Sequence, residues 1–245
     1  MPRYFLHLAY RGAPFHGWQI QPGQTTVQSV IEDALTKLTR RPTPIVGAGR
    51  TDAGVNASMM VAHFDAPAPP SVRAINSICG NDIAIYSVTE VHPQAHARFD
   101  ATSRTYHYRA LTARSPFLND LAWRPVKPLD YEAMNRAAAI LPHITDFTSF
   151  AKLHSDARTN ICHVTHARWD PDPLTGGMTF TITADRFLRN MVRAIVGTLV
   201  DVGRGKLSTE GFRDIIDARD RCAAGTSMPP HALYLARITY PYWNA

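Results

Sequence analysis

The sequence predicts an α+β protein in which two halves repeat one order of elements. Alternating large apolar and smaller or polar residues indicate strands, and apolar residues at helical spacing indicate helices. The order in the first half is strand, helix, two strands, helix, strand, and the second half repeats it with one additional helix. Each half is therefore expected to be a split βαβ, ferredoxin-like unit, and the two antiparallel sheets to adjoin at a central cleft.

The first half shows this pattern clearly, with Thr25 or Thr26 available to cap the first helix. A glycine-rich turn separates its two middle strands. The elements expected here are a strand at 4–10, a helix at 27–38, strands at 44–48 and 59–64, a helix at 71–79 and a strand at 82–91.

The second half is expected to contain a strand at 103–111, a helix at 131–141, strands at 161–169 and 178–184, helices at about 186–202 and at 208–219, and a strand at 233–240. We place the boundary near residues 100–104, which gives units 1–103 and 104–245. The long helix would carry Arg186, Arg189 and Arg193 in one narrow arc opposite its apolar face. Such a stripe is either a solvated surface or a site for a polyanion.

The composition is that of an ordinary folded protein with a basic balance. There are 26 lysines and arginines against 20 aspartates and glutamates, so the formal net charge is +6. Basic residues that cluster favour polyanion binding. Cys79, Cys162 and Cys222 are few, distant from one another and outside any CxxC pair, which favours a reducing compartment over disulfides or zinc. With no apolar signal or spanning segment, a cytoplasmic protein without membrane contact is expected.

The run from Gly47 to Ala57 contains the strongest candidates for reactive side chains. Its glycines flank Arg50 and Asp52, and a strand pattern follows. Glycines at this density indicate a tight turn or the close approach of another molecule. The run is neither a Walker P-loop nor a dinucleotide fingerprint. An aspartate at such a place is commonly a turn former, but the arginine and the basic chain favour a displayed, reactive carboxylate.

From Gly49 to Val55 the chain resembles the GRTDAGVHA signature of TruA-type tRNA pseudouridine synthases. The resemblance runs nearly end to end, because further blocks match in the same order. These blocks are 10–12 with 15–19, 26–28, 96–99 with 104–108, 146–150, 191–197 and 233–235. The resemblance implies a pseudouridine synthase fold that isomerises uridine to pseudouridine, without metal or other cofactor.

The resemblance also implies roles for three side chains. Asp52 matches the catalytic aspartate and would attack C1′ of the ribose or C6 of the uracil. Tyr106 matches the tyrosine that packs on the target base and is a candidate for removing the C5 proton, with Tyr108 on the same strand face as the lesser candidate. Arg193 matches the arginine that pairs with the aspartate. The alternative for the tyrosines is that both fill the core.

Arg50 would handle the flipped nucleotide, and other side chains would contact RNA without reading its sequence. The expected RNA-binding residues are Arg50, Thr51, Arg98, Arg104, Tyr108, Arg186 and Arg189. By resemblance, the partner is the anticodon stem-loop of tRNA, modified at positions 38–40, and the protein is a homodimer.

Three positions depart from the family pattern. Asn56 stands where the family has His, Asn190 interrupts the family's FLyHMVR block, and Ala232 replaces a Gly. Asn56 can form hydrogen bonds but cannot titrate, so the change is tolerable if the His orients backbone or RNA, and harmful if it shuttles a proton. His163 and His166 would point to opposite faces of a strand, which disfavours a metal site.

Two other classes of function remain open at this stage. A tRNA-binding or RNA-folding module with a weakened active site would keep affinity for tRNA without the reaction. An enzyme that acts on a small molecule would have no affinity for RNA.

Overall fold

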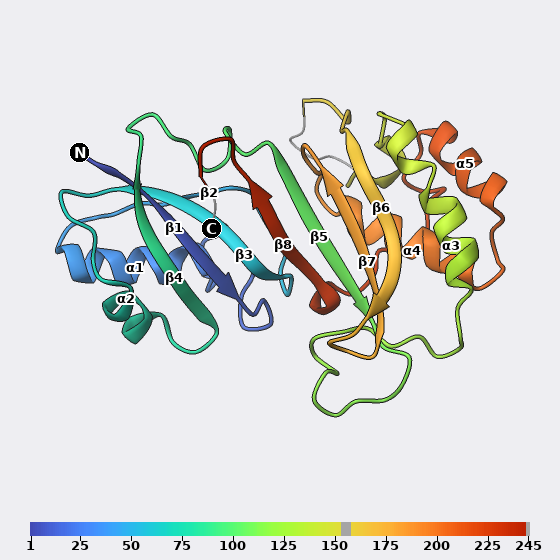
Figure 1. The fold of residues 1–245 in the computed structure, drawn as a ribbon, viewed down its shortest axis with the longest axis horizontal. Coiled ribbons are helices and arrows are strands. Elements are labelled where there is room, and N and C mark those ends of the chain that lie inside the picture. The colour runs from blue at the N-terminus through green and yellow to red at the C-terminus, as the bar shows by residue number, and fades with distance from the viewer. Residues whose placement is uncertain (153–157, 244–245) are drawn as a thin grey trace. The chain divides into compact units, whose positions relative to one another are not determined.

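The computed structural model describes residues 1–152 and 158–243. The chain forms two compact units. Unit 1 contains Met1–Thr102 with Tyr234–Ala245, and unit 2 contains Ser103–Leu233 (Figure 1). The division expected from the sequence placed all of residues 104–245 together. The structure instead assigns the C-terminal strand to unit 1, because that strand pairs with a strand of the first half.

Unit 1 is a sheet with the strand order β4-β1-β3-β8, in which β2 also pairs with β3. β1 is antiparallel to both β3 and β4, and β8 is parallel to β3. Two helices pack against each other beside this sheet. The elements are β1 (Arg3–Tyr10), α1 (Val27–Thr39), β2 (Val46–Gly47), β3 (Asn56–Asp65), α2 (Val72–Cys79), β4 (Ile83–Val91) and β8 (Leu233–Thr239), the last belonging to unit 1 from Tyr234 onward.

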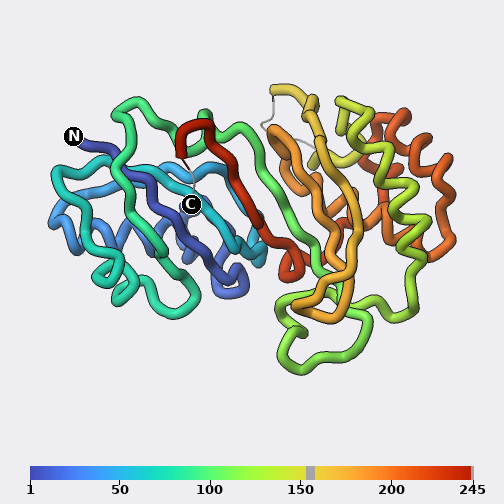
Figure 2. Tube along the Cα trace, in the orientation of Figure 1, coloured from blue at the N-terminus to red at the C-terminus, as the bar shows by residue number. Residues whose placement is uncertain are grey.

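Unit 2 contains the antiparallel strands β5-β7-β6 and three helices that pack against one another. Figure 2 shows the chain of this unit passing from green through yellow and orange to red. The elements are β5 (Ser103–Ala110), α3 (Tyr131–Ala138), β6 (Val164–Asp172), β7 (Gly177–Ala184), α4 (Met191–Gly203) and α5 (Thr209–Ala218), with short 3-10 helices at Leu141–His143, Thr148–Phe150 and Pro230–Ala232.

The predicted α+β class is confirmed, with mostly antiparallel strands. The expected cap of the first helix is also confirmed. The Thr26 side chain accepts the N–H of Ser29, and the Ser29 hydroxyl accepts the N–H of Thr26, which forms a reciprocal capping pair. The hydrophobic positions of α1 identified by spacing, such as Val27 and Ile31, lie in the core.

The prediction of a helix from about residue 186 is wrong. α4 begins at Met191, because Asn190 adopts a left-handed backbone conformation with φ of 65°, which a right-handed helix cannot continue. Arg186 and Arg189 therefore lie in a non-helical segment before α4. They do not form a stripe with Arg193 on one helix face, so that argument for a polyanion site fails.

No helix in the described part of the chain combines the length and the apolar character needed to cross a membrane.

Candidate functional site

Asp52 lies in the turn that joins β2 to β3. Its backbone carbonyl accepts the N–H of Val55 at 3.1 Å, and Gly54 adopts a φ of 77°. This conformation suits glycine and closes the turn directly before β3 begins at Asn56. The Asp52 side chain is half-buried. The carboxylate is therefore carried by a tight turn whose far end is fixed to the sheet.

Two glycines from the segment after β1 pack against this turn. A Cβ at Gly12 would overlap the backbone carbonyl of Val55. A Cβ at Gly17, where φ is 88°, would stand 2.5 Å from the carbonyl oxygen of Thr51 and 3.2 Å from the carbonyl carbon of Asp52. Any other residue at either position would push the turn away.

Sequence reasoning missed the role of Gly12 and Gly17, because it expected the tight turn or the close approach at the glycines of the Asp52 run itself. Apart from Gly49 itself and its two chain neighbours, no described residue has an atom within 4 Å of where a Cβ would stand at Gly49. The signal that could have identified the two glycines is their place in the matched blocks at 10–12 and 15–19.

Thr51 is buried and held from two sides. Its hydroxyl is 2.8 Å from the Tyr10 hydroxyl, and its carbonyl accepts the N–H of Trp18 at 3.2 Å. The Trp18 ring lies directly over Gly47, so that a Cβ at this glycine would stand 2.5 Å from the ring. Thr51, which was expected to contact RNA, thus has buried structural contacts that brace the turn.

Asn56 has a structural role in the same turn. Its side chain is 2% exposed, and its Oδ1 accepts the backbone N–H of Gly12 at 2.8 Å. This hydrogen bond ties the start of β3 to the segment that packs on the turn. In this chain the side chain at position 56 therefore contacts backbone, which agrees with the alternative in which the residue there orients backbone.

Arg50 and Arg98 are both exposed in unit 1. The Arg98 guanidinium lies 5.9 Å from the centroid of the Phe99 ring, which is itself 75% exposed. His96 organises this segment, because its Nδ1 accepts the backbone N–H groups of Arg98 and Phe99 at 3.1 and 3.2 Å. Asp100 accepts the N–H of His96 at 2.7 Å. A basic and an aromatic side chain are thus displayed on an ordered loop.

Tyr106 lies on β5, opposite Ile182 of β7. Its half-buried ring meets the ring of Phe187 nearly edge to face, with 5.0 Å between centroids and 83° between planes. This contact fixes the ring orientation while part of the ring stays accessible.

Tyr108, two residues along β5, is fully buried, and within the described residues its hydroxyl has no hydrogen-bond partner. Burial raises the pKa of this phenol far above its usual range, although the positive charge of Arg193 acts in the opposite direction. The structure places Tyr108 in the core of unit 2.

Arg193 lies in the first turn of α4, where its Nε donates to the carbonyl of Met228 at 2.6 Å. Arg104 on β5 donates from Nη1 to the carbonyl of Asp185 at 2.8 Å. Arg186 donates more weakly to the carbonyl of Thr159 at 3.4 Å. The side chain of Arg189 is exposed.

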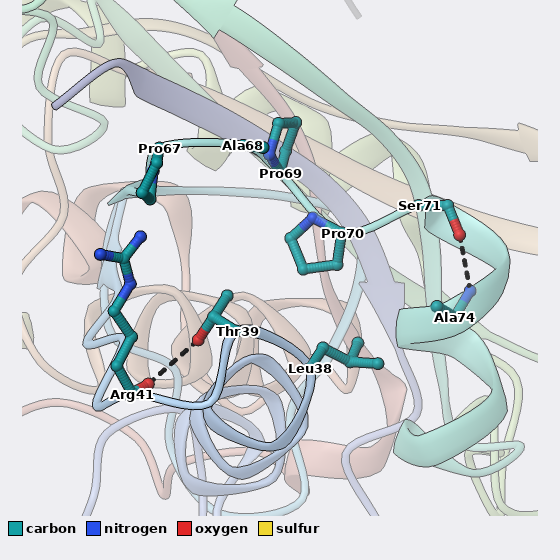
Figure 3. A pocket seen from close by; sticks show the side chains of 9 residues that line it. All are labelled: Leu38, Thr39, Arg41, Pro67, Ala68, Pro69, Pro70, Ser71 and Ala74. Atoms are coloured by element: carbon teal, nitrogen blue, oxygen red, sulfur yellow. Dashed lines mark hydrogen bonds between the residues drawn. The ribbon is translucent and has the colours of Figure 1, made fainter.

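Unit 1 also has a hollow between the end of α1 and the segment that leads into α2 (Figure 3). Its polar groups have local partners, since Thr39 donates to the Arg41 carbonyl at 3.0 Å and Ser71 accepts the N–H of Ala74 at 3.2 Å. The lining residues are Leu38, Thr39, Arg41, Pro67, Ala68, Pro69, Pro70, Ser71 and Ala74. This lining contains no predicted site residue.

The described residues include no group of three or more His, Cys, Asp or Glu side chains arranged to hold a metal ion.

Comparison with known proteins gives concordant matches. A family model described as tRNA pseudouridine synthase matches residues 144–241. The tRNA pseudouridine synthase A of Parabacteroides distasonis is 55% identical over 247 residues, covering 98% of this chain and 97% of the relative. That of Porphyromonas gingivalis is 53% identical, covering 98% of each. The enzyme of the same name from Limosilactobacillus fermentum is 37% identical, covering 98% of this chain and 96% of the relative.

Proposed function

Because the chain belongs to the tRNA pseudouridine synthase A family, we propose that it isomerises uridine to pseudouridine in the anticodon arm of tRNA, at positions 38–40. The observation that carries the proposal is the braced turn that presents Asp52. Gly12 and Gly17 pack on this turn, and Tyr10 holds Thr51 beside the carboxylate. A carboxylate that must attack one carbon of a bound nucleotide needs such a fixed support.

In the proposed reaction the N1–C1′ bond of uridine breaks and a C5–C1′ bond forms. The proton on C5 is lost and N1 gains one, so that atoms and charge balance. Asp52 acts as the nucleophile that divides this exchange into two steps, through attack on C1′ or on C6. Neither route needs a cofactor.

Tyr106 is proposed to stack on the extruded uracil and to remove the C5 proton. Its partly accessible ring, held edge to face by Phe187, supports the stacking role. Arg193 is proposed to pair with the Asp52 carboxylate, as the family resemblance implies. A guanidinium suits this role because it stays charged and donates in a fixed plane.

The proposed RNA contacts differ in how readily their side chains reach a phosphate. Arg50, Arg98 and Arg189 are exposed and are the first candidates. Arg104 and Arg186 already donate to backbone carbonyls, and Thr51 and Tyr108 are buried, so we rank these four lower.

Further parts of the proposal concern the assembly and the fold. A homodimer is proposed from the family resemblance alone, and a cytoplasmic location from the few, widely separated cysteines. We also infer that unit 1 is a ferredoxin-like split βαβ unit. The antiparallel order β4-β1-β3 with β2 on the far side of β3 supports that inference.

The decisive experiment compares Asp52→Asn with the control Asp33→Asn, which removes an exposed carboxylate paired with Lys37. Unmodified tRNA is incubated with each protein, and pseudouridine is mapped nucleotide by nucleotide. We expect Asp52→Asn to form none while binding tRNA with nearly unchanged affinity, and the control to match the original protein. Pseudouridine formation by Asp52→Asn at the original rate would refute the nucleophile.

The same assay separates the alternatives. A weakened tRNA-binding module would bind tRNA, with affinity falling steeply as salt rises, and would form no pseudouridine. An enzyme acting on a small molecule would not bind tRNA.

A further inference from the structure

The segment from Arg221 to Met228 is bonded to Arg193 twice. The Met228 carbonyl accepts the Nε–H of Arg193 at 2.6 Å, and the Met228 N–H donates to the backbone carbonyl of Arg193 at 3.1 Å. One residue thus binds both the main chain and the side chain of Arg193. These two bonds fix the guanidinium relative to the helix that carries it.

Ser227 anchors this segment to the start of α4. Its Oγ accepts a hydrogen bond from Nδ2 of Asn190 at 2.5 Å and another from Nη2 of Arg221 at 2.9 Å. Asn190 is the residue whose left-handed conformation sets where α4 begins. The position of Ser227, and with it that of the adjacent Met228 carbonyl, is therefore tied to the first turn of the helix.

The Arg221 side chain forms hydrogen bonds within the same segment. Its Nη1 lies 3.3 Å from the carbonyl oxygens of both Ala224 and Gly225, while its Nη2 reaches Ser227. The planar guanidinium thus gathers three acceptors from one short loop, which an ammonium group could not do in the same geometry.

Close packing presses the same segment onto α4 one turn beyond Arg193. A Cβ at Gly197 would collide with the carbonyl of Thr226, and a Cβ at Gly225 would stand 2.9 Å from the backbone nitrogen of Thr198. Thr198 accepts the N–H of Gly225 at 2.9 Å. The backbone of the segment therefore rests directly on the backbone of the helix.

From this arrangement we infer that Arg221 and Ser227 are positioning residues for Arg193, acting through the Met228 carbonyl. The inference rests on the proposed function, in which Arg193 orients the nucleophile. A free arginine side chain samples many rotamers, and ordering it costs free energy. Here the segment supplies that order before substrate binds, so the guanidinium needs little rearrangement during the reaction.

The test uses Ser227→Ala and Arg221→Lys, with Ser227→Thr as the conservative rescue and Arg219→Lys as the matched control. Arg219 is exposed in the same unit and pairs with Asp146 at 3.1 Å. Since each change loses hydrogen bonds, we expect kcat for pseudouridine formation to fall about 3- to 10-fold in Ser227→Ala and Arg221→Lys. KM for tRNA should change less than about twofold, and Ser227→Thr and the control should keep the original kcat.

A double-mutant cycle distinguishes positioning of Arg193 from a purely structural role of Arg221 and Ser227. Arg193→Lys keeps the charge but lacks the Nε–H that Met228 accepts. If Arg221 and Ser227 act through Arg193, their substitution in the Arg193→Lys background should lower the rate no further. Equal losses in both backgrounds, or a rise in KM with unchanged kcat, would overturn the inference. If Arg193→Lys has no measurable rate, the single variants Ser227→Ala and Arg221→Lys decide, provided that they unfold thermally at the same temperature as the original protein. A lower kcat with an unchanged KM then supports the positioning role.

Failure of the proposed function would look different, because the original protein itself would form no pseudouridine. An active original protein whose kcat is unchanged by Ser227→Ala and Arg221→Lys would refute the positioning role alone.

Discussion

The Asn56 side chain accepts the backbone N–H of Gly12 at 2.8 Å in the buried part of unit 1. The bond joins the first residue of β3 to the segment that packs under the Asp52 turn. It gives a local reason for an acceptor at position 56, and it does not require that side chain to titrate.

We predict that Asn56→His keeps both stability and activity, whereas Asn56→Ala loses both. A neutral imidazole can accept the Gly12 N–H, but alanine leaves that buried donor without this acceptor, at a cost of about 1–3 kcal/mol in the free energy of unfolding. Thermal unfolding and single-turnover conversion of tRNA measure the two effects. A rate that gains a new dependence on pH in Asn56→His would show instead that a proton passes through this position.

For Tyr108 we predict that replacement by phenylalanine leaves affinity for tRNA unchanged and stability equal or higher. The substitution removes a buried hydroxyl that has no partner among the described residues, and it retains the ring that fills the core. Chemical denaturation and tRNA binding are the measurements. Weaker binding by Tyr108→Phe would show that this hydroxyl reaches RNA.

The stability of unit 1 should fall as the pH drops from about 6.5 to 4, and His63 should cause part of that fall. Burial, aided by Arg3 and His96 and opposed by Asp65 and Asp100, lowers the pKa of His63 to about 4. Between pH 6.5 and pH 4 the His63 imidazole is protonated in the unfolded chain but largely neutral in the folded chain. Protonation therefore favours unfolding in this range. The effect amounts to about 3 kcal/mol in the free energy of unfolding at most.

Unfolding curves measured at several pH values should show this slope in the original protein and a shallower one in His63→Gln. His166→Gln, which changes an exposed histidine of β6, should keep the original slope. Identical slopes for all three proteins would contradict the assignment.

Local rules predicted the elements whose signals lie in neighbouring residues. Thr26 precedes a clean helical period, and Ser71 precedes another, so the starts of α1 and α2 were predictable. The start of α4 was not, because Phe187 and Leu188 continue the apolar period across residues that are not helical. The left-handed conformation of Asn190 determines where α4 begins, and the spacing of hydrophobic residues does not reveal it.

In the candidate site, sequence reasoning located the Asp52 turn but not what supports it. Gly12 and Gly17 act through contacts with a backbone far along the chain, and such contacts have no local periodicity. The same holds for Met228, whose carbonyl holds Arg193 across a long stretch of sequence. A main-chain acceptor can belong to any residue type, so composition does not reveal it. The roles of Asp52, Tyr106 and Arg193 in the reaction stay predictions.

The return of β8 to unit 1 has a consequence for the order of folding. Asn56 and Ala57 meet Tyr234 and Leu235 in parallel register, and the Tyr240 hydroxyl donates to the Ala97 carbonyl. During synthesis the ribosome releases these partners only after all of unit 2 has been made. The sheet that carries the Asp52 turn therefore lacks β8 beside the start of β3 until the whole of unit 2 has been made.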